Sequence, residues 1–380
     1  MDFSLTEQQE MIRRTVRDIA QKVVAPRAAE MDRTAEYPWD IKEVLAKQGL
    51  LGIIIPEEYG GVGADLLTAC LIIEELAKVD ASTACIMVAA VDGVFTMLIA
   101  ANEEQRKRYF SRIATGEIGS AIAITEPGAG SDVAAMSSKA VREGDHYRLN
   151  GVKHFISMGT GLCELFTVFA ITDPGKGAKS FSAFIVEKDY PGFTIGKHED
   201  KMGVRAVPNV EIIMDDVKVP AANLLGKEGD GFKLVMQALD RARPGVAAQS
   251  VGIAQGALDF AVEYAKTRVQ FGQPIGQFQG IQFMLADMAT QVEAARYLTY
   301  RAATLIQDGA KEGPKFAAMA KVFASDMAMS VTTDAVQVVG GYGYMKDYPV
   351  ERMMRDAKLM QLFVGTNQIQ RMIIARTMVG

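Results

Sequence analysis

The sequence predicts an α+β protein in which an N-terminal helical domain, a β domain and a C-terminal four-helix bundle follow one another along the chain. Two observations favour this order: apolar residues recur at helical spacing towards both ends, and short β-rich runs separated by Gly, Pro and Asp fill the middle. The length of 380 residues also exceeds the size at which one hydrophobic core stops growing. We therefore expect domains at 1–118, 119–225 and 226–380.

The first domain is expected to be helical because Ile12, Val16 and Ile19 follow the spacing of an amphipathic face. Between residues 80 and 103 the only charged side chain before Glu103 is Asp92, and such a run is long enough to cross a bilayer. Since Asp92 lies at its middle and no second span follows, we interpret it as a buried helix pair and expect no membrane insertion.

In the second domain, runs such as 165–171 and 181–186 have the composition of strands. From Gly231 onward helical patterns return, with breaks near Gly272, Gly313 and Gly340 that indicate about four long helices packed as a bundle. Strands and helices do not alternate, which argues against a doubly wound nucleotide-binding fold.

Charge and cysteine content exclude several classes of function. A net charge of −5 and a pI of about 5.5 give no footprint for nucleic acid. Three widely spaced cysteines fit neither a disulfide framework nor a zinc site, and the three histidines are too dispersed for a metal. The acidic N-terminus lacks the basic and apolar regions of a secretory signal, so we expect a cytoplasmic protein.

One glycine-rich segment follows a strand-like run and is a candidate ligand loop. It comprises Thr125-Glu126-Pro127-Gly128-Ala129-Gly130-Ser131-Asp132. Glycines let backbone amides approach a ligand closely, and the hydroxyls of Thr125 and Ser131 add donors and acceptors. Taken alone, the same composition is also typical of a polar turn between strands.

This segment resembles the flavin-contacting signature of the acyl-CoA dehydrogenase family, and the resemblance extends over essentially the whole chain. Four further segments in the expected order support it: 56–61, 150–153, 267–272 and 337–341. The resemblance implies the family fold of helical domain, β domain and helical bundle. It also implies FAD as cofactor, an acyl-CoA substrate, electron-transferring flavoprotein as oxidant and a homotetramer.

Carried over position by position, the resemblance assigns a cofactor site. Segments in the β domain would line the flavin ring, and residues of the C-terminal domain would reach the pyrophosphate and adenosine across a subunit interface or complete the site. The implied cofactor residues are Ile122, Ile124, Thr125, Gly130, Ser131, Phe155, Ile156, Ser157, Arg268, Phe271, Gln279, Gln337, Gly341, Thr366 and Gln368.

The resemblance also implies substrate contacts. Asp240 and Arg243 would contact the pantetheine and adenine parts of CoA, and Ser131 would touch the CoA chain. On residue type alone, Asp240 and Arg243 are equally an exposed pair on one helix face.

The catalytic position departs from the family. The segment Leu362-Phe363-Val364-Gly365-Thr366-Asn367-Gln368-Ile369-Gln370-Arg371 resembles the family motif Ile-Tyr-Glu-Gly-Thr-Ser-Gln-Ile-Gln-Arg, whose Glu removes the α-proton. Here Val364 occupies that place. Ala242 occupies the alternative place used by some members. Val364 keeps its backbone N–H, so Val364 and Gly365 would still polarise the thioester carbonyl.

Asp92 is the best remaining candidate for the base. A carboxylate among aliphatic groups loses hydration, which raises its pKa and makes it a better proton acceptor near neutral pH. The alternative is that Asp92 caps a helix beginning near Gly93.

A base that has moved off the α-carbon fits an α,β-unsaturated ring thioester, whose acidic proton is at the γ-carbon. The pattern is similar to the family subgroup that oxidises cyclohex-1-ene-1-carboxyl-CoA to a cyclohexadiene-carboxyl-CoA in anaerobic bacteria, with hydride transfer to flavin N5. Two alternatives remain: a saturated alicyclic or branched short-chain acyl-CoA oxidised with a displaced base, or a flavoprotein that binds acyl-CoA without oxidising it.

Overall fold

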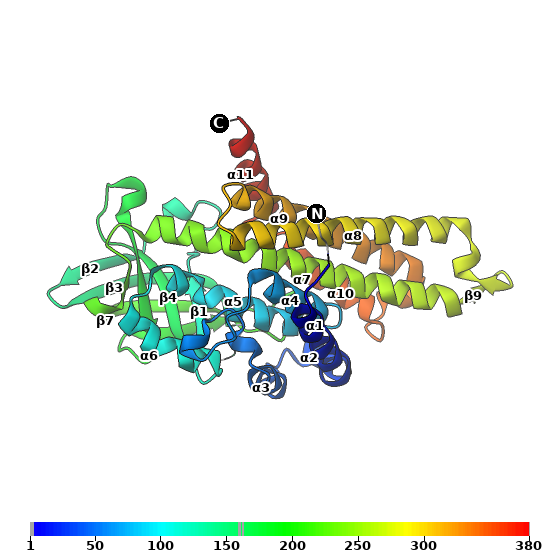
Figure 1. Ribbon diagram of the computed structural model, residues 1–380, viewed down its shortest axis with the longest axis horizontal. Helices are drawn as coiled ribbons and strands as arrows, with labels where there is room; N and C mark the ends of the chain where they lie inside the picture. The colour runs from blue at the N-terminus through cyan, green and yellow to red at the C-terminus, as the bar shows by residue number, and fades with distance from the viewer. Residues whose placement is uncertain (1–3, 159–160, 162, 380) are drawn as a thin grey trace.

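The computed structural model describes residues 4–158, 161 and 163–379. The molecule is elongated: the β domain forms one end, one long C-terminal helix runs from it to the other end, and the N-terminal helices pack beside the middle of the molecule (Figure 1). The predicted order of a helical, a β and a second helical domain is confirmed.

Side-chain caps start several of the N-terminal helices. Thr6 and Gln9 form a reciprocal capping box at the start of α1, and Asp65 accepts from the Thr68 N–H at the start of α4. Asn102 begins the last helix in the same way. The domain comprises α1 (Glu7–Ile19), α2 (Ala28–Thr34), α3 (Trp39–Lys47), α4 (Leu66–Ala77), α5 (Ala81–Ala100) and α6 (Glu103–Ala114).

The expectation of a helix pair between residues 80 and 103 is wrong, because α5 is one continuous helix of 20 residues. Its N-cap is Asp80, which accepts from the Thr83 N–H at 2.6 Å, and Asp92 and Gly93 lie inside it. Among the described helices α5 alone is long and apolar enough to cross a membrane, and 72% of its most apolar window is buried. The helix packs against α4, α7 and β1, so protein surrounds its apolar faces.

The middle of the chain forms an eight-stranded sheet. Its path runs β6-β7-β3-β2-β4-β5-β8, and β1 pairs in parallel with β4. A separate apolar core lies within this domain. The strands are β1 (Gly119–Ala123), β2 (Lys139–Glu143), β3 (His146–Ser157), β4 (Cys163–Ile171), β5 (Phe181–Glu187), β6 (Phe193–His198), β7 (Asn209–Pro220) and β8 (Leu224–Leu225).

The sequence predicted about four long helices in the C-terminal domain. The described residues of this domain instead form three long helices and two shorter ones. The longest, α7 (Gly231–Thr267), has 37 residues and spans about 55 Å at 1.5 Å per residue. It begins against β5 and ends at a hairpin of two short strands. The remaining elements are β9 (Val269–Gln270), β10 (Gln273–Pro274), α8 (Gln279–Gln307), α9 (Gly313–Val339), α10 (Pro349–Met360) and α11 (Asn367–Val379).

Candidate functional site

The end of β1 and the glycine-rich loop lie against β3, which brings two predicted groups of cofactor residues together. The His154 N–H donates to the Thr125 carbonyl at 2.8 Å, and the Lys153 Nζ donates to the Ile124 carbonyl at 3.1 Å. Ile122, Ile124 and Thr125 are all half-buried. Their side chains therefore keep a face that a ligand can contact.

A buried ion pair, which sequence reasoning missed, fixes this loop. The Lys153 Nζ lies 2.8 Å from Glu126 Oε1, and both residues are buried. Burial opposes ionisation of Glu126, but the Lys153 charge and donors from Ser138 and Ser137 lower the pKa of this carboxyl to about 2. Because Glu126 accepts from Ser137 N and Ser138 N at 2.6 and 3.0 Å, it joins both ends of the loop.

The glycine-rich loop is open on its outer side. Gly130 and Ser131 are exposed, and a Cβ built at Gly128 or Gly130 would meet nothing within 4 Å. Nearby backbone amides are thus free to approach a bulky anionic or aromatic ligand closely.

Phe155 has the backbone conformation of a functional residue. Its φ is +57°, which is uncommon for a residue with a bulky side chain, and its ring is 60% exposed and stacked on His154 at 4.0 Å. Ser157, two residues later, is half-buried. The Ile156 side chain packs in the core of the β domain, which leaves only its backbone for a ligand.

Asp92 is not a helix cap, because α5 begins eleven residues before it. Within the described residues no hydrogen-bond donor or cation pairs with its carboxylate, and burial raises its pKa to about 8. From Ala81 to Met97 every residue of α5 is buried except Ala89 and Asp92, which are half-buried. Three residues apart, these two share one face of the helix, and the described residues do not fully cover that face.

Asp92 lies near the predicted flavin site. Cys85 precedes it by two helical turns on the same face, and the Cys85 thiol lies within hydrogen-bonding reach of Ser157. Burial is the main cause that raises the Cys85 pKa to about 11, and the Asp92 carboxylate adds to it. The face of α5 that carries Asp92 therefore continues to the end of β3 that is predicted to cover the flavin.

Gly93 explains how a helix comes so close to the sheet. A Cβ at this position would lie 2.5 Å from the Ser120 Oγ and 2.7 Å from the Ser120 carbonyl oxygen of β1. Only glycine permits this approach, which holds Asp92 beside the strand that leads into the glycine-rich loop.

Asp240 and Arg243 form an ion pair on α7, but the pair is not an exposed one. The Arg243 side chain is only 4% exposed, and its Nε is buried without a hydrogen-bond partner among the described residues. Burial raises the pKa of Asp240 and lowers that of Arg243, and each partner's charge opposes the shift. Pro244 inside α7 has no N–H, which leaves the Asp240 carbonyl without its helical donor. This part of α7 thus offers an unpaired donor beside a carbonyl that lacks its regular helical bond.

Val364 lies in a strained turn between α10 and α11. Its φ is +53°, a genuine outlier for a β-branched residue, and Gly365 follows at +88°. The Gln370 side-chain amide donates to the carbonyls of Val364 and Gly365 at 3.2 and 2.9 Å. Both residues and Thr366 are half-buried, whereas Gln368 is exposed. The chain therefore maintains a costly backbone geometry although Val364 has no reactive side chain.

A second group of predicted residues gathers at the far end of the helical domain. Arg268 and Gly341 line a cavity of about 540 Å³, and the Arg268 guanidinium lies 5.3 Å from the ring centre of Tyr342. Phe271 has a φ of +51° and is 93% exposed. Gln279 and Gln337 are also exposed.

The predicted cofactor residues are thus divided between two distant places. The β domain and the β9–β10 hairpin lie at opposite ends of the molecule, with most of the length of α7 between them (Figure 1). One chain does not bring these two groups into one site.

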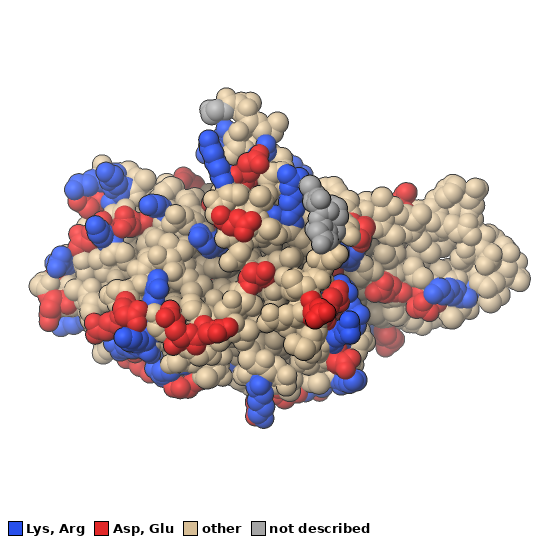
Figure 2. All heavy atoms as spheres, viewed as in Figure 1, with Lys and Arg blue, Asp and Glu red and all other residues tan. Residues whose placement is uncertain are grey.

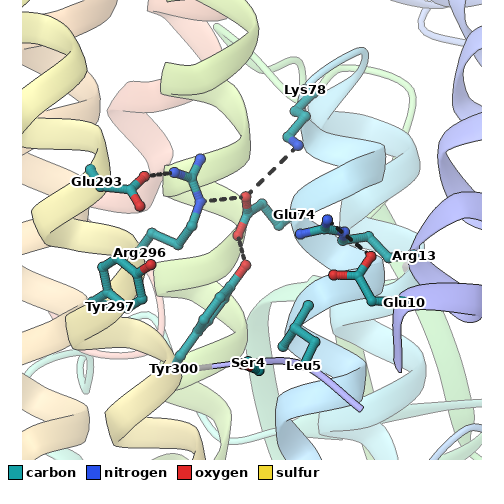
Figure 3. A pocket seen from close by; sticks show the side chains of 10 residues that line it. All are labelled: Ser4, Leu5, Glu10, Arg13, Glu74, Lys78, Glu293, Arg296, Tyr297 and Tyr300. Atoms are coloured by element: carbon teal, nitrogen blue, oxygen red, sulfur yellow. Dashed lines mark hydrogen bonds and ion pairs between the residues drawn. The ribbon is translucent and has the colours of Figure 1, made fainter. Parts of the chain in front are cut away.

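A further cavity, of about 490 Å³, contains none of the predicted residues. It lies among α1, α4 and α8, and its charged side chains pair with one another. Glu74, for example, accepts from the Arg296 guanidinium at 2.9 Å and also from the Tyr300 hydroxyl at 2.8 Å (Figure 3). No group of His, Cys, Asp or Glu suited to a metal occurs among the residues described.

Comparison with known proteins identifies similar chains. Models of the N-terminal, middle and C-terminal domains of acyl-CoA dehydrogenases match residues 6–117, 121–217 and 229–379. An acyl-CoA dehydrogenase of Bacillus subtilis is 49% identical over 377 residues, 99% of each chain. Cyclohex-1-ene-1-carbonyl-CoA dehydrogenases of Geobacter metallireducens and Syntrophus aciditrophicus are 50% and 48% identical, over 98% of this chain and 98% and 90% of theirs.

Solved structures agree over the whole length. Butyryl-CoA dehydrogenase from Megasphaera elsdenii has a TM-score of 0.97 at 44% identity, with 100% of both chains covered. A structure described as the electron transferring flavoprotein of Acidaminococcus fermentans has a TM-score of 0.97 at 48% identity and the same coverage. The FAD complex of PigA has a TM-score of 0.94 at 30% identity, covering 100% of this chain and 99% of that one.

Proposed function

This chain belongs to the acyl-CoA dehydrogenase family, and we propose that it oxidises the cyclic unsaturated thioester cyclohex-1-ene-1-carboxyl-CoA to a cyclohexadiene-carboxyl-CoA. As a member of this family it is an FAD-dependent oxidoreductase that acts on CH–CH groups of acyl-CoA thioesters. The observation that carries this proposal is the carboxylate of Asp92. It has no partner among the described residues and a raised pKa, and together with Ala89 it keeps partial exposure on a stretch of α5, from Ala81 to Met97, that is otherwise buried.

The residue at position 364 supports a substrate without an α-proton. Val364 cannot accept a proton, and the other family position, Ala242, is a buried alanine. An α-carbon that is already trigonal has no proton to lose, whereas the γ-carbon of the same thioester does, because its anion is conjugated with the carbonyl. A base on α5 in place of one on the α10–α11 turn fits that change.

Atoms and electrons balance for a 1,4-dehydrogenation of the ring. Asp92 takes a proton from C3, the C3–H electron pair forms the C2=C3 bond, and the C1=C2 pair moves to C1=C6 as hydride leaves C6. FAD, when bound, supplies the hydride acceptor. The Val364 N–H donates to the thioester oxygen, which gains charge as the C3 proton leaves. Protonated Asp92 is neutral, so its apolar surroundings favour the product state of the transfer.

The residues present fit FAD. The open glycine-rich loop and the exposed Phe155 ring suit a flavin, and the Arg268 guanidinium suits a pyrophosphate. Because these groups lie at opposite ends of one chain, we propose that a second copy supplies Arg268, Phe271, Gln279, Gln337 and Gly341, within a homotetramer.

The surface near the β9–β10 hairpin supports such an assembly. Figure 2 shows few charged side chains on this end of the bundle in the face in view. Exposed apolar residues gather there, and such patches mark interaction sites. They are Val269, Phe271, Phe283, Tyr342, Tyr344 and Met345.

We also propose electron-transferring flavoprotein as the oxidant and the cytoplasm as the location. The first is supported by the similarity to the Acidaminococcus fermentans structure. The second fits the three cysteines, which are all buried and form no disulfide among the described residues.

Anaerobic mixing with acyl-CoAs, followed at the flavin absorbance maximum, tests the proposal. Cyclohex-1-ene-1-carboxyl-CoA should bleach the flavin, and Asp92→Asn should slow bleaching by about 10²- to 10⁴-fold while FAD content and substrate binding persist. Full activity of Asp92→Asn would contradict the assignment of the base.

A second candidate substrate is a saturated alicyclic or branched short-chain acyl-CoA, favoured by the similarity to enzymes named simply acyl-CoA dehydrogenase. Faster bleaching by cyclohexanecarboxyl-CoA or butyryl-CoA than by the cyclohexene thioester would establish it. Binding of all three without bleaching would identify a flavoprotein that only binds acyl-CoA.

A further inference from the structure

The turn that carries Val364 is attached at both ends to a single carboxylate. Gln361, which precedes the turn, and Asn367, which follows it, each donate a side-chain amide hydrogen to Asp326 Oδ1 at 2.7 Å. The Asn367 N–H also donates to the Gln361 carbonyl at 3.0 Å, which closes the loop of residues 362–366.

Asn367 is itself oriented by a buried lysine. The Lys321 Nζ on α9 donates to Asn367 Oδ1 at 2.8 Å, and the other end of the amide donates to the Ser325 Oγ at 2.9 Å. Lys321 is 0% exposed and Asn367 is 3% exposed. An amide bonded on both its oxygen and its nitrogen cannot flip, so the direction of the Asp326 contact is fixed.

The burial of Lys321 is costly and is not offset by a direct ion pair. No carboxylate lies within 4 Å of its Nζ among the described residues, and a buried ammonium is unfavourable unless its hydrogen bonds are satisfied. Burial is the main cause that lowers the Lys321 pKa to about 7; Asp326 opposes the shift and Arg243 adds to it. A methionine or leucine would fill this volume without such a cost.

We infer that Lys321, acting through Asn367, is a positioning residue that holds the Val364 N–H at the angle needed to polarise the thioester carbonyl. The inference rests on the proposed function, since it refines the role of the turn. Val364 has a positive φ angle that a free turn would relax, whereas Gly365 adopts its positive φ without strain. The clamp of Lys321, Asp326 and Asn367 fixes the ends of the turn, and Gln370 holds its two carbonyls.

Isotope-edited infrared spectroscopy of a bound thioester measures this polarisation without turnover. The probes are benzoyl-CoA and crotonyl-CoA, each ¹³C-labelled at the thioester carbonyl, bound to the FAD-loaded oxidised enzyme. In the wild type the carbonyl stretch of the bound probe should shift to lower frequency than in solution. Lys321→Met and Asn367→Leu should each remove most of that shift while changing probe affinity by only about threefold.

Two controls separate positioning from general stability. Lys315→Met alters a half-buried lysine on the same helix, α9, and should leave the shift unchanged. Asn367→Ser keeps a hydroxyl acceptor for Lys321 but loses the amide donor to Asp326, so it should retain part of the shift and more of it than Asn367→Leu. Flavin reduction by the true substrate should fall about 10- to 100-fold in Lys321→Met, less than the about 10²- to 10³-fold cost of removing an oxyanion donor outright, because the Val364 N–H is misaligned but still present.

The outcomes distinguish this inference from the proposed function. A wild-type carbonyl shift that persists in folded Lys321→Met and Asn367→Leu overturns the positioning role alone. A shift seen with crotonyl-CoA but not with benzoyl-CoA contradicts the ring substrate and leaves the clamp to be judged by the variants. Failure of both probes to bind, or to shift, overturns both.

Discussion

Ala89 and Asp92 lie three residues apart on one face of α5, and they are the only residues between Ala81 and Met97 that keep partial exposure. Up to Met97 the helix is otherwise enclosed, and protein leaves it incompletely covered at these two positions. A small side chain and a lone carboxylate at that opening are the features expected of a cavity that admits a bulky acyl group and removes a proton from it.

The first prediction concerns pH. The basic form of Asp92 is the carboxylate, and its pKa of about 8 means that most of the free enzyme is protonated at pH 7. The kcat/KM should therefore rise about tenfold per pH unit below 8 and level off above it. A pH profile between 6 and 9.5 with the cyclohexene thioester checks this, and a flat profile would argue against Asp92 as the base.

The same raised pKa has a predicted effect on stability. The folded protein binds this proton more tightly than the unfolded chain, whose reference pKa is 3.8. The contribution of Asp92 to stability is therefore complete below pH 3.8 and is lost as pH rises through about 8. Relative to the wild type, Asp92→Asn should gain thermal stability as pH rises from about 4 to 8 and gain no more above 8, measured as the difference in melting temperature between the two proteins at each pH.

Enlarging Ala89 should exclude rings. Ala89→Leu adds three carbons to the open face one turn before Asp92, so we expect kcat/KM for the cyclohexene thioester to fall by at least about tenfold, mainly through KM. Crotonyl-CoA, which is narrower, should lose less affinity. Ala89→Ser, which is nearly isosteric, serves as the size control. Equal losses for ring and linear thioesters would mean that Ala89 does not border the acyl group.

Restoring the family base should change the substrate. Val364→Glu places a carboxylate on the turn that already has the required backbone geometry, and we expect it to confer flavin reduction by saturated cyclohexanecarboxyl-CoA. Val364→Gln has the same size and no basicity, so it should remain inactive with this substrate. Bleaching of the flavin by both variants, or by neither, would show that the turn does not approach the α-carbon.

Breaking the Glu126–Lys153 pair should loosen the glycine-rich loop. Glu126→Gln leaves a buried ammonium without its counter-charge, a change that costs about 3–5 kcal/mol. Thermal unfolding and retention of FAD on gel filtration should both decline. The double variant Glu126→Gln with Lys153→Met removes both charges and should recover part of each loss; no recovery would mean that the hydrogen bonds of Glu126, not its charge, hold the loop.

Sequence reasoning succeeded where one residue type determines the chemistry locally. Strand-like runs, helical spacing and the family motifs placed the elements, whereas Asp92 as the base, expected from the absence of Glu at position 364, remains a prediction. The sequence alone left open whether a new helix begins near Gly93, with Asp92 as its cap, or whether one helix continues through both residues. Gly93 is instead required by the close approach of Ser120, a contact between segments distant in the sequence.

Other features of the site were beyond the reach of sequence patterns because they depend on tertiary contacts. The pairing of Lys153 with Glu126 joins residues 27 positions apart, and the contact of Lys321 with Asn367 joins residues 46 positions apart. A buried lysine has no signature of its own in a helical pattern. The positive φ of Val364 was likewise hidden, because valine seldom adopts it.

The two groups proposed to act on the thioester belong to different halves of the chain: Asp92 lies on α5, and the Val364 amide lies beyond α10. Their separation is therefore set by how α5 and α4 pack against α7, not by any bond within one element. Heating that loosens the packing of α4 and α5 against α7 would misalign the proton acceptor and the amide well before either half of the chain unfolds. Enzyme activity should consequently depend on the packing between the domains. Residues far from the acyl group should be among those that limit the highest temperature at which the enzyme remains active.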